Sequence, residues 1–111
     1  MSQTNPIGGT NPPQYSPDEL RRYREDYQQG LDLFQKAFDA HREPQLEFHK
    51  KQQLEKVMSE ALQVMNETAS VVLKKEKLEK AKALSERYTQ FLKDPSSQNE
   101  QKVFEGIQDL K

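Results

Sequence analysis

The 111-residue sequence contains no cysteine, no tryptophan and only four glycines. Without cysteine, a disulfide framework, a zinc–thiolate site and a thiol nucleophile are excluded. No apolar run exceeds three residues, which excludes a membrane-spanning helix of about 20 apolar residues. Neither sign of charge dominates, because 17 Lys and Arg residues balance 18 Asp and Glu residues. This balance argues against a nucleic-acid-binding protein, which usually carries a strong basic excess.

Strong core-forming residues are scarce as well, since Leu, Ile, Val and Phe together account for 23 of the 111 residues. A β-sandwich or a doubly wound sheet needs a larger core than this, whereas long thin helices need less. The sequence also lacks the strict apolar–polar alternation that is typical of half-buried strands. The composition therefore predicts an all-α protein, and all but one of these 23 residues lie from Leu20 onward.

Residues 1–15 differ from the rest of the chain, because they hold three of the six prolines, two of the four glycines and no charged side chain. Such a segment buries too little surface to offset its ordering entropy, so we predict a disordered tail. It has neither the basic start nor the apolar stretch of a secretory signal peptide, and we expect a cytoplasmic protein. Its polar, uncharged composition is also compatible with a non-cleaved export signal. Residues 16–111 are expected to form a single helical domain.

The first helix has the clearest sequence signals. Ser16-Pro17-Asp18-Glu19 combines a capping box with proline at the first helical position. From Leu20 to His41 the apolar positions recur every three or four residues, which predicts one helical stripe. Pro44 disfavours helical dihedral angles in the preceding residue, so this helix is predicted near 17–42.

The next helical region, residues 45–93, has no proline or glycine and carries two apolar stripes that do not share a register. Asn, Thr and Ser in residues 66–70 weaken the helix between the stripes. We therefore predict helices near 45–66 and 70–93, joined by a turn at 67–70. The alternative is one continuous helix over the whole region.

A short last helix is predicted near 98–110, after the break at Asp94-Pro95. Ser97-Gln98-Asn99-Glu100 forms a second capping box. At about 13 residues this helix is too short to be stable alone, so it must dock on the rest of the chain or on a partner.

Three helices of similar length with short connections predict a small antiparallel three-helix bundle or a helical hairpin, with the short fourth helix at the C-terminus. In this arrangement one end of the bundle gathers aromatic side chains that contribute strongly to the core. The expected members are Phe34, Phe38, Phe48, Tyr88 and Phe91.

The motifs that carry catalysis or bind cofactors are missing. There is no glycine-rich phosphate loop, no nucleophile elbow and no Glu-x-x-His or His-Glu-x-x-His pair. His41, Glu43, Glu47 and His49 surround Pro44 and offer an alternative as a metal site. Packing of His41 at a helix end and solvation of His49 are the favoured interpretation. We therefore expect no enzyme activity, no cofactor and no bound metal.

The sequence thus favours a non-enzymatic interaction module, a small chaperone or adaptor that binds a helix of another protein. An accessory protein of a bacterial secretion apparatus fits the chain size, the lack of cysteine and residues 1–15. Methionine-containing stripes adapt well to varied partners. The predicted partner-binding residues are Leu54, Met58, Ala61, Met65, Phe104 and Ile107. The alternative is a structural protein that assembles with itself, as a homo-oligomer or filament, through the heptad-like stripe of the second helix.

Overall fold

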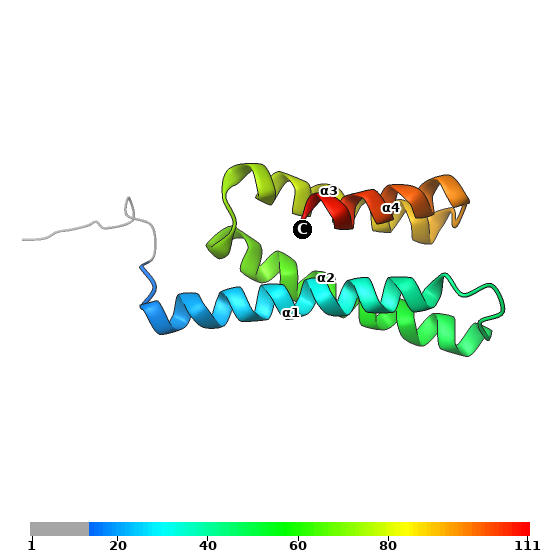
Figure 1. Ribbon diagram of the computed structural model, residues 1–111, viewed down its shortest axis with the longest axis horizontal. Coiled ribbons are helices and arrows are strands. Elements are labelled where there is room, and N and C mark those ends of the chain that lie inside the picture. Colours follow the sequence, from blue (N-terminus) through cyan, green and yellow to red (C-terminus); the bar gives the residue numbers. More distant parts are fainter. Residues whose placement is uncertain (1–13) are drawn as a thin grey trace, which may run out of the picture.

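A computed structural model of the chain describes residues 14–111. This range contains four helices and no strand: α1 (Pro17–His41), α2 (Phe48–Val72), α3 (Lys75–Lys93) and α4 (Ser97–Asp109). Figure 1 shows two antiparallel hairpins, α1 with α2 and α3 with α4, stacked one on the other. The all-α prediction with a short fourth helix is confirmed. The predicted tail falls mostly on residues 1–13, which lie outside the described residues.

The start of α1 has the predicted capping box. The Ser16 hydroxyl accepts a hydrogen bond from the Glu19 N–H at 3.1 Å, and the Glu19 carboxylate accepts one from the Ser16 N–H at 2.9 Å. Hydrogen bonding from Ser16 to the carboxylate, first from its backbone N–H and then from its side chain, lowers the pKa of the Glu19 carboxyl, because it stabilises the ionised form. Just before the helix, the Tyr15 ring meets the Tyr23 ring edge-on at 5.3 Å between centroids. The last residue of the predicted tail therefore packs on α1.

The connection from α1 to α2 is longer than predicted. α1 ends at His41 as expected, but α2 begins at Phe48 rather than at Gln45. The intervening residues reverse the chain through a turn in which the Leu46 N–H donates to the Glu43 carbonyl at 3.3 Å. Residues used in this reversal cannot also belong to the first turn of α2.

The predicted turn at 67–70 is wrong, because α2 continues through it to Val72. The Thr68 hydroxyl donates to the Val64 carbonyl at 2.9 Å, so this side chain is satisfied inside the helix instead of capping a new one. The break falls at Leu73 and Lys74, which have extended backbone with ψ of 145° and 163°. The alternative of one continuous helix over 45–93 is therefore excluded as well.

The start of α4 also differs from the prediction by one residue. Ser96, not Ser97, caps the helix, and its hydroxyl accepts from the Asn99 N–H at 3.2 Å. The Asn99 side chain holds this turn by donating to the Asp94 carbonyl at 2.8 Å. The Glu100 carboxylate instead lies 3.3 Å from Nε of Arg42, the residue that follows α1.

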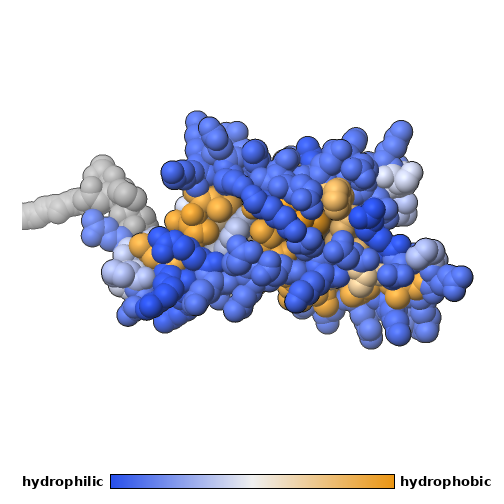
Figure 2. Space-filling model, in the orientation of Figure 1, coloured by the Kyte–Doolittle hydropathy of each residue, from blue (hydrophilic) through white to orange (hydrophobic). Residues whose placement is uncertain are grey.

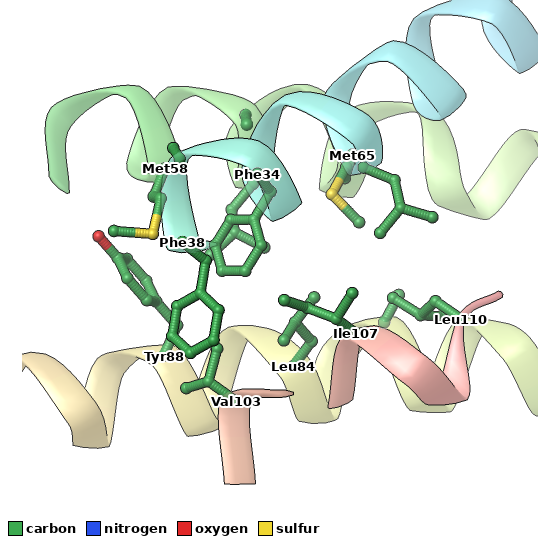
Figure 3. Close-up of a cluster of buried hydrophobic side chains, with 14 of the residues drawn as sticks. Phe34, Phe38, Met58, Met65, Leu84, Tyr88, Val103, Ile107 and Leu110 are labelled. Atoms are coloured by element: carbon green, nitrogen blue, oxygen red, sulfur yellow. The ribbon is translucent and has the colours of Figure 1, made fainter. Parts of the chain in front are cut away.

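The core lies between the two hairpins and takes side chains from all four helices (Figure 3). The predicted aromatic cluster forms around Phe34, whose ring lies 5.3 Å from that of Tyr88. Phe38 lies 6.1 Å from Phe91. Phe48 was expected in this cluster but is 68% exposed. Phe48 lies six residues before Leu54, so its side chain points about 120° around the helix from that of Leu54.

The two hairpins do not cover their shared interface completely. Figure 2 shows hydrophobic surface along the seam between them, chiefly toward the turn from α2 to α3, whereas most of the rest of this face is hydrophilic. The half-buried side chains of Val72, Leu73 and Leu78 pack against the core in this region. The described helices include none that is long and apolar enough to cross a membrane.

Candidate functional site

The predicted partner-binding stripe of α2 lies mostly inside the molecule. Met58, Ala61 and Met65 are at most 3% exposed and belong to the core. Figure 3 shows both methionines pointing toward the α3–α4 hairpin. Leu54 is half-buried against the same core. These side chains hold the two hairpins together, so a partner would reach the methionines only if the hairpins separated.

The predicted C-terminal part of that surface is also largely covered. Ile107 is 1% exposed, and Phe104 is half-buried against the core. The guanidinium of Arg42 lies over the Phe104 ring at 5.4 Å from its centroid and over the Phe38 ring at 5.5 Å. This stacking attaches α4 to the end of α1. That the six predicted residues bind a partner stays a prediction, and for most of them it requires a change of conformation.

The α1–α2 hairpin carries a second apolar surface that the sequence analysis missed. A groove of about 490 Å³ lies between the two helices, and its sides include Leu33 of α1 and Val64 of α2. Leu33 is 49% exposed and Val64 is 38% exposed. We call this surface the outer groove. It is lined by Tyr23, Asp26, Gln29, Gly30, Leu33, Glu60, Ala61, Val64, Glu67 and Thr68.

Gly30 explains why the outer groove is hollow. A Cβ atom on residue 30 would come within 2.9 Å of Met65 Cγ and 3.1 Å of the Ala61 carbonyl oxygen. The two helices therefore lie close together at this point, where Ala61 faces Gly30 and neither residue contributes a large side chain. The bulkier side chains of Tyr23, Leu33 and Val64 stand around this point. Gly30 and Ala61 therefore form the floor of the outer groove, and the larger side chains form its sides.

The outer groove is acidic. Asp26 of α1 and Glu60 and Glu67 of α2 line it, and its described lining includes no Lys, Arg or His. None of the ion pairs within residues 14–111 involves any of these three carboxylates. The groove thus combines exposed apolar side chains with three carboxylates that form no ion pair with residues 14–111.

A second groove, of about 510 Å³, lies between α2 and α3. Asn66 and Ser85 bridge its two sides, with the amide donating to the hydroxyl at 3.1 Å and the hydroxyl in contact with the amide oxygen at 3.3 Å. Its apolar residues Leu62 and Tyr88 are buried, and only Leu92, at 43%, is well exposed. This groove therefore exposes one large apolar side chain, whereas the outer groove exposes two.

The two histidines do not build a metal site. Nε2 of His41 lies 2.9 Å from Oε2 of Glu55, and the His41 ring packs edge-on against Phe91 at 5.7 Å. Nδ1 of His41 is buried without a hydrogen-bond partner. His49 is exposed. Within residues 14–111, no three His, Asp or Glu side chains are grouped so that they could hold a metal ion.

The sequence of α2 contains a second apolar stripe beside the one through Met58 and Met65, and this second stripe indicates the outer groove. Val57, Ala61, Val64, Thr68 and Val71 recur with the same spacing of four and three residues as the stripe through Met58 and Met65. The two stripes share Ala61 and Thr68 and lie next to each other on α2. Of the second stripe, Ala61, Val64 and Thr68 line the groove, whereas Val57 packs against the core. On α1, Leu33 similarly stands one position before the buried Phe34. Two adjacent stripes indicate a helix with partners on two sides.

No protein-family model, curated protein or solved structure matches this chain.

Proposed function

We propose that this protein is a non-enzymatic interaction module, an adaptor or small chaperone, that binds a helix of another protein in the outer groove. The observation that carries the proposal is the pair Leu33 and Val64, two large apolar side chains exposed on either side of the Gly30–Ala61 floor. Grooves between two helices are common docking sites for an amphipathic helix. Burial of these side chains by a partner would contribute about 25 cal/mol per Å² of apolar area.

The proposal keeps the class of function expected from the sequence but moves the contact surface. The buried stripe of α2 is used for the chain's own packing, and the adjacent stripe through Val64 supplies the contact. A secretion-apparatus accessory protein acting in the cytoplasm is one form of this proposal, supported by chain size and by the polar residues 1–15. The self-assembly alternative is less favoured, because the heptad-like stripe through Met58 and Met65 is buried in the chain's own core.

Photo-cross-linking in the source cells tests this proposal. A photo-reactive p-benzoylphenylalanine replaces Leu33 in one variant and Leu92 in a matched control, because both leucines are exposed to a similar extent but lie on different hairpins. We expect the variant at position 33 to form an adduct with a specific protein and the variant at position 92 to form none. Equal labelling at both positions would count against the outer groove.

The captured protein then serves as the ligand in a binding measurement by calorimetry. Leu33→Ser should weaken its affinity about tenfold, the effect of losing roughly one buried leucine contact of 1.5 kcal/mol. Leu92→Ser should leave the affinity unchanged. An affinity that is the same for Leu33→Ser and the wild type would show that the adduct arises from chance proximity.

A further inference from the structure

We infer that the outer groove selects a basic amphipathic helix, one that carries Lys or Arg on both flanks of its apolar face. This inference rests on the proposed function and adds the chemistry of the partner. Its basis is the position of the three groove carboxylates, with Asp26 on the α1 side and Glu60 and Glu67 on the α2 side. A helix lying between α1 and α2 therefore meets negative charge on both flanks.

The spacing on α2 fits a helical partner. Glu60 and Glu67 are seven residues apart, which corresponds to about two turns and roughly 10 Å along the helix. Both carboxylates are exposed, with Val64 between them in the sequence. Cationic side chains at positions i and i+7 of a bound helix recur on one face at the same interval. The partner's apolar residues between those positions would lie over Leu33 and Val64.

The negative charge of the outer groove also disfavours other occupants. A second copy docking through the same surface about a two-fold axis would bring Asp26, Glu60 and Glu67 of one copy against the same residues of the other. Like charges brought together at an interface suppress such pairing. Nucleic acids and anionic lipid surfaces carry negative charge, so the groove would repel them too. A cationic protein helix is the class that fits both the apolar floor and the acidic sides.

Two synthetic peptides probe this selectivity directly. The first is an amphipathic helix of roughly 18 residues, about five turns, built from Leu on one face and Lys on the other. The second is its twin with Glu in place of every Lys. Fluorescence anisotropy measures the binding of each peptide to the full chain, at about 0.01 M and 0.15 M ionic strength, where the screening length falls from about 30 to 8 Å.

The Leu–Lys peptide should bind, and bind more weakly at the higher ionic strength, whereas the Leu–Glu twin should not bind. Glu60→Gln combined with Glu67→Gln should weaken Leu–Lys binding about three- to tenfold at low salt. The matched control is Glu76→Gln with Glu79→Gln, which removes the same charge from exposed positions on α3. The control should change affinity much less. Leu33→Ser should weaken binding at both ionic strengths.

Four results would overturn the inference. Equal binding of both peptides, with Leu33→Ser weakening both, leaves the outer groove as a docking site but removes its preference for basic partners. Leu–Lys binding that is indifferent to Leu33→Ser and to the Glu60 and Glu67 changes places the peptide elsewhere on the molecule. Sedimentation of the wild type as a dimer that Leu33→Ser converts to a monomer assigns the groove to a second copy. Absence of peptide binding together with absence of an adduct at position 33 removes the proposed function as well.

Discussion

Gly30 of α1 lies so close to the backbone of Ala61 of α2 that a Cβ atom on residue 30 would stand 3.1 Å from the Ala61 carbonyl oxygen. Two features of the molecule depend on this contact. On the inner side it lets Met65, 1% exposed, reach the core, and on the outer side it leaves the floor of the outer groove without a large side chain. One glycine thus serves both the fold and the candidate site.

Gly30→Ala should destabilise the protein, although alanine is the better helix former by about 1 kcal/mol. The added methyl group would press on Met65 Cγ and on backbone that cannot move aside, and such overpacking costs about 1–3 kcal/mol. We expect a net loss of about 1 kcal/mol, seen as a fall of roughly 4–8 °C in the thermal midpoint by circular dichroism.

Gly106→Ala is the matched control for this prediction. Its nearest neighbour is the terminal Cδ1 of Leu84 at 3.0 Å, which is side chain rather than backbone. The gain in helix propensity should offset the contact and keep stability within about 1 kcal/mol of the wild type. A thermal midpoint of Gly30→Ala equal to or above that of Gly106→Ala would show that the close approach of α1 and α2 does not require glycine.

Phe38→Ala should cost about 3–5 kcal/mol of unfolding free energy, because it empties a site in the aromatic cluster where the side chain is 0% exposed. Phe48→Ala should change the free energy by less than about 0.5 kcal/mol, because that ring is 68% exposed. Denaturant unfolding of the two variants measures the difference. Similar losses from both would show that Phe48 belongs to the core in solution.

Arg42→Gln should loosen the docking of α4. Arg42 stacks on Phe38 and Phe104 and faces the Glu100 carboxylate at 3.3 Å, and loss of these partly exposed contacts should cost about 1 kcal/mol. Hydrogen exchange should accelerate at the amides of α4 more than at those of α1. Arg24→Gln, at an exposed position on α1, should leave the pattern unchanged. Uniform acceleration across all helices would contradict a local role of Arg42.

Alkaline pH should destabilise the fold through two buried tyrosines. Burial raises the pKa of Tyr27 and of Tyr88 above the ordinary value of 10.0, and the Glu55 carboxylate adds to the rise at Tyr88. A raised pKa means that the folded state holds the phenol proton more tightly than the unfolded state. This contribution is therefore complete below about pH 10 and is lost as the pH rises through the folded-state values.

Urea unfolding of the wild type between about pH 9 and pH 12, which spans the ordinary tyrosine pKa, measures this loss. The slope of stability against pH should be smaller in the double variant Tyr27→Phe with Tyr88→Phe. The slope is the informative quantity, because Tyr88→Phe also removes a 3.0 Å hydrogen bond to the Glu55 carbonyl and lowers stability by about 1 kcal/mol at every pH. Identical slopes would show that neither phenol is linked to folding.

Much of the fold could be predicted from the sequence, because capping residues and prolines act on the backbone next to them. The capping box at Ser16 and the breaks near Pro44 and Pro95 fix where the chain starts and stops being helical, since each acts through the backbone of its immediate neighbours. The end of α2 could not be predicted in this way. Thr68 has the side chain of a capping residue, but burial and a bond to the Val64 carbonyl keep it inside the helix.

The sequence by itself determined an all-α chain with four amphipathic helices, because apolar spacing and end signals are properties of each segment alone. It did not determine which of two adjacent stripes of α2 faces inward, because Leu54–Met58–Ala61–Met65 and Val57–Ala61–Val64–Thr68 have the same spacing of four, three and four residues. The tertiary structure decided this when the α3–α4 hairpin stacked over the methionine stripe. Covering that stripe left Leu33 and Val64 exposed on the opposite groove. Only the stacking of the hairpins therefore separates the core from the surface that we propose for a partner.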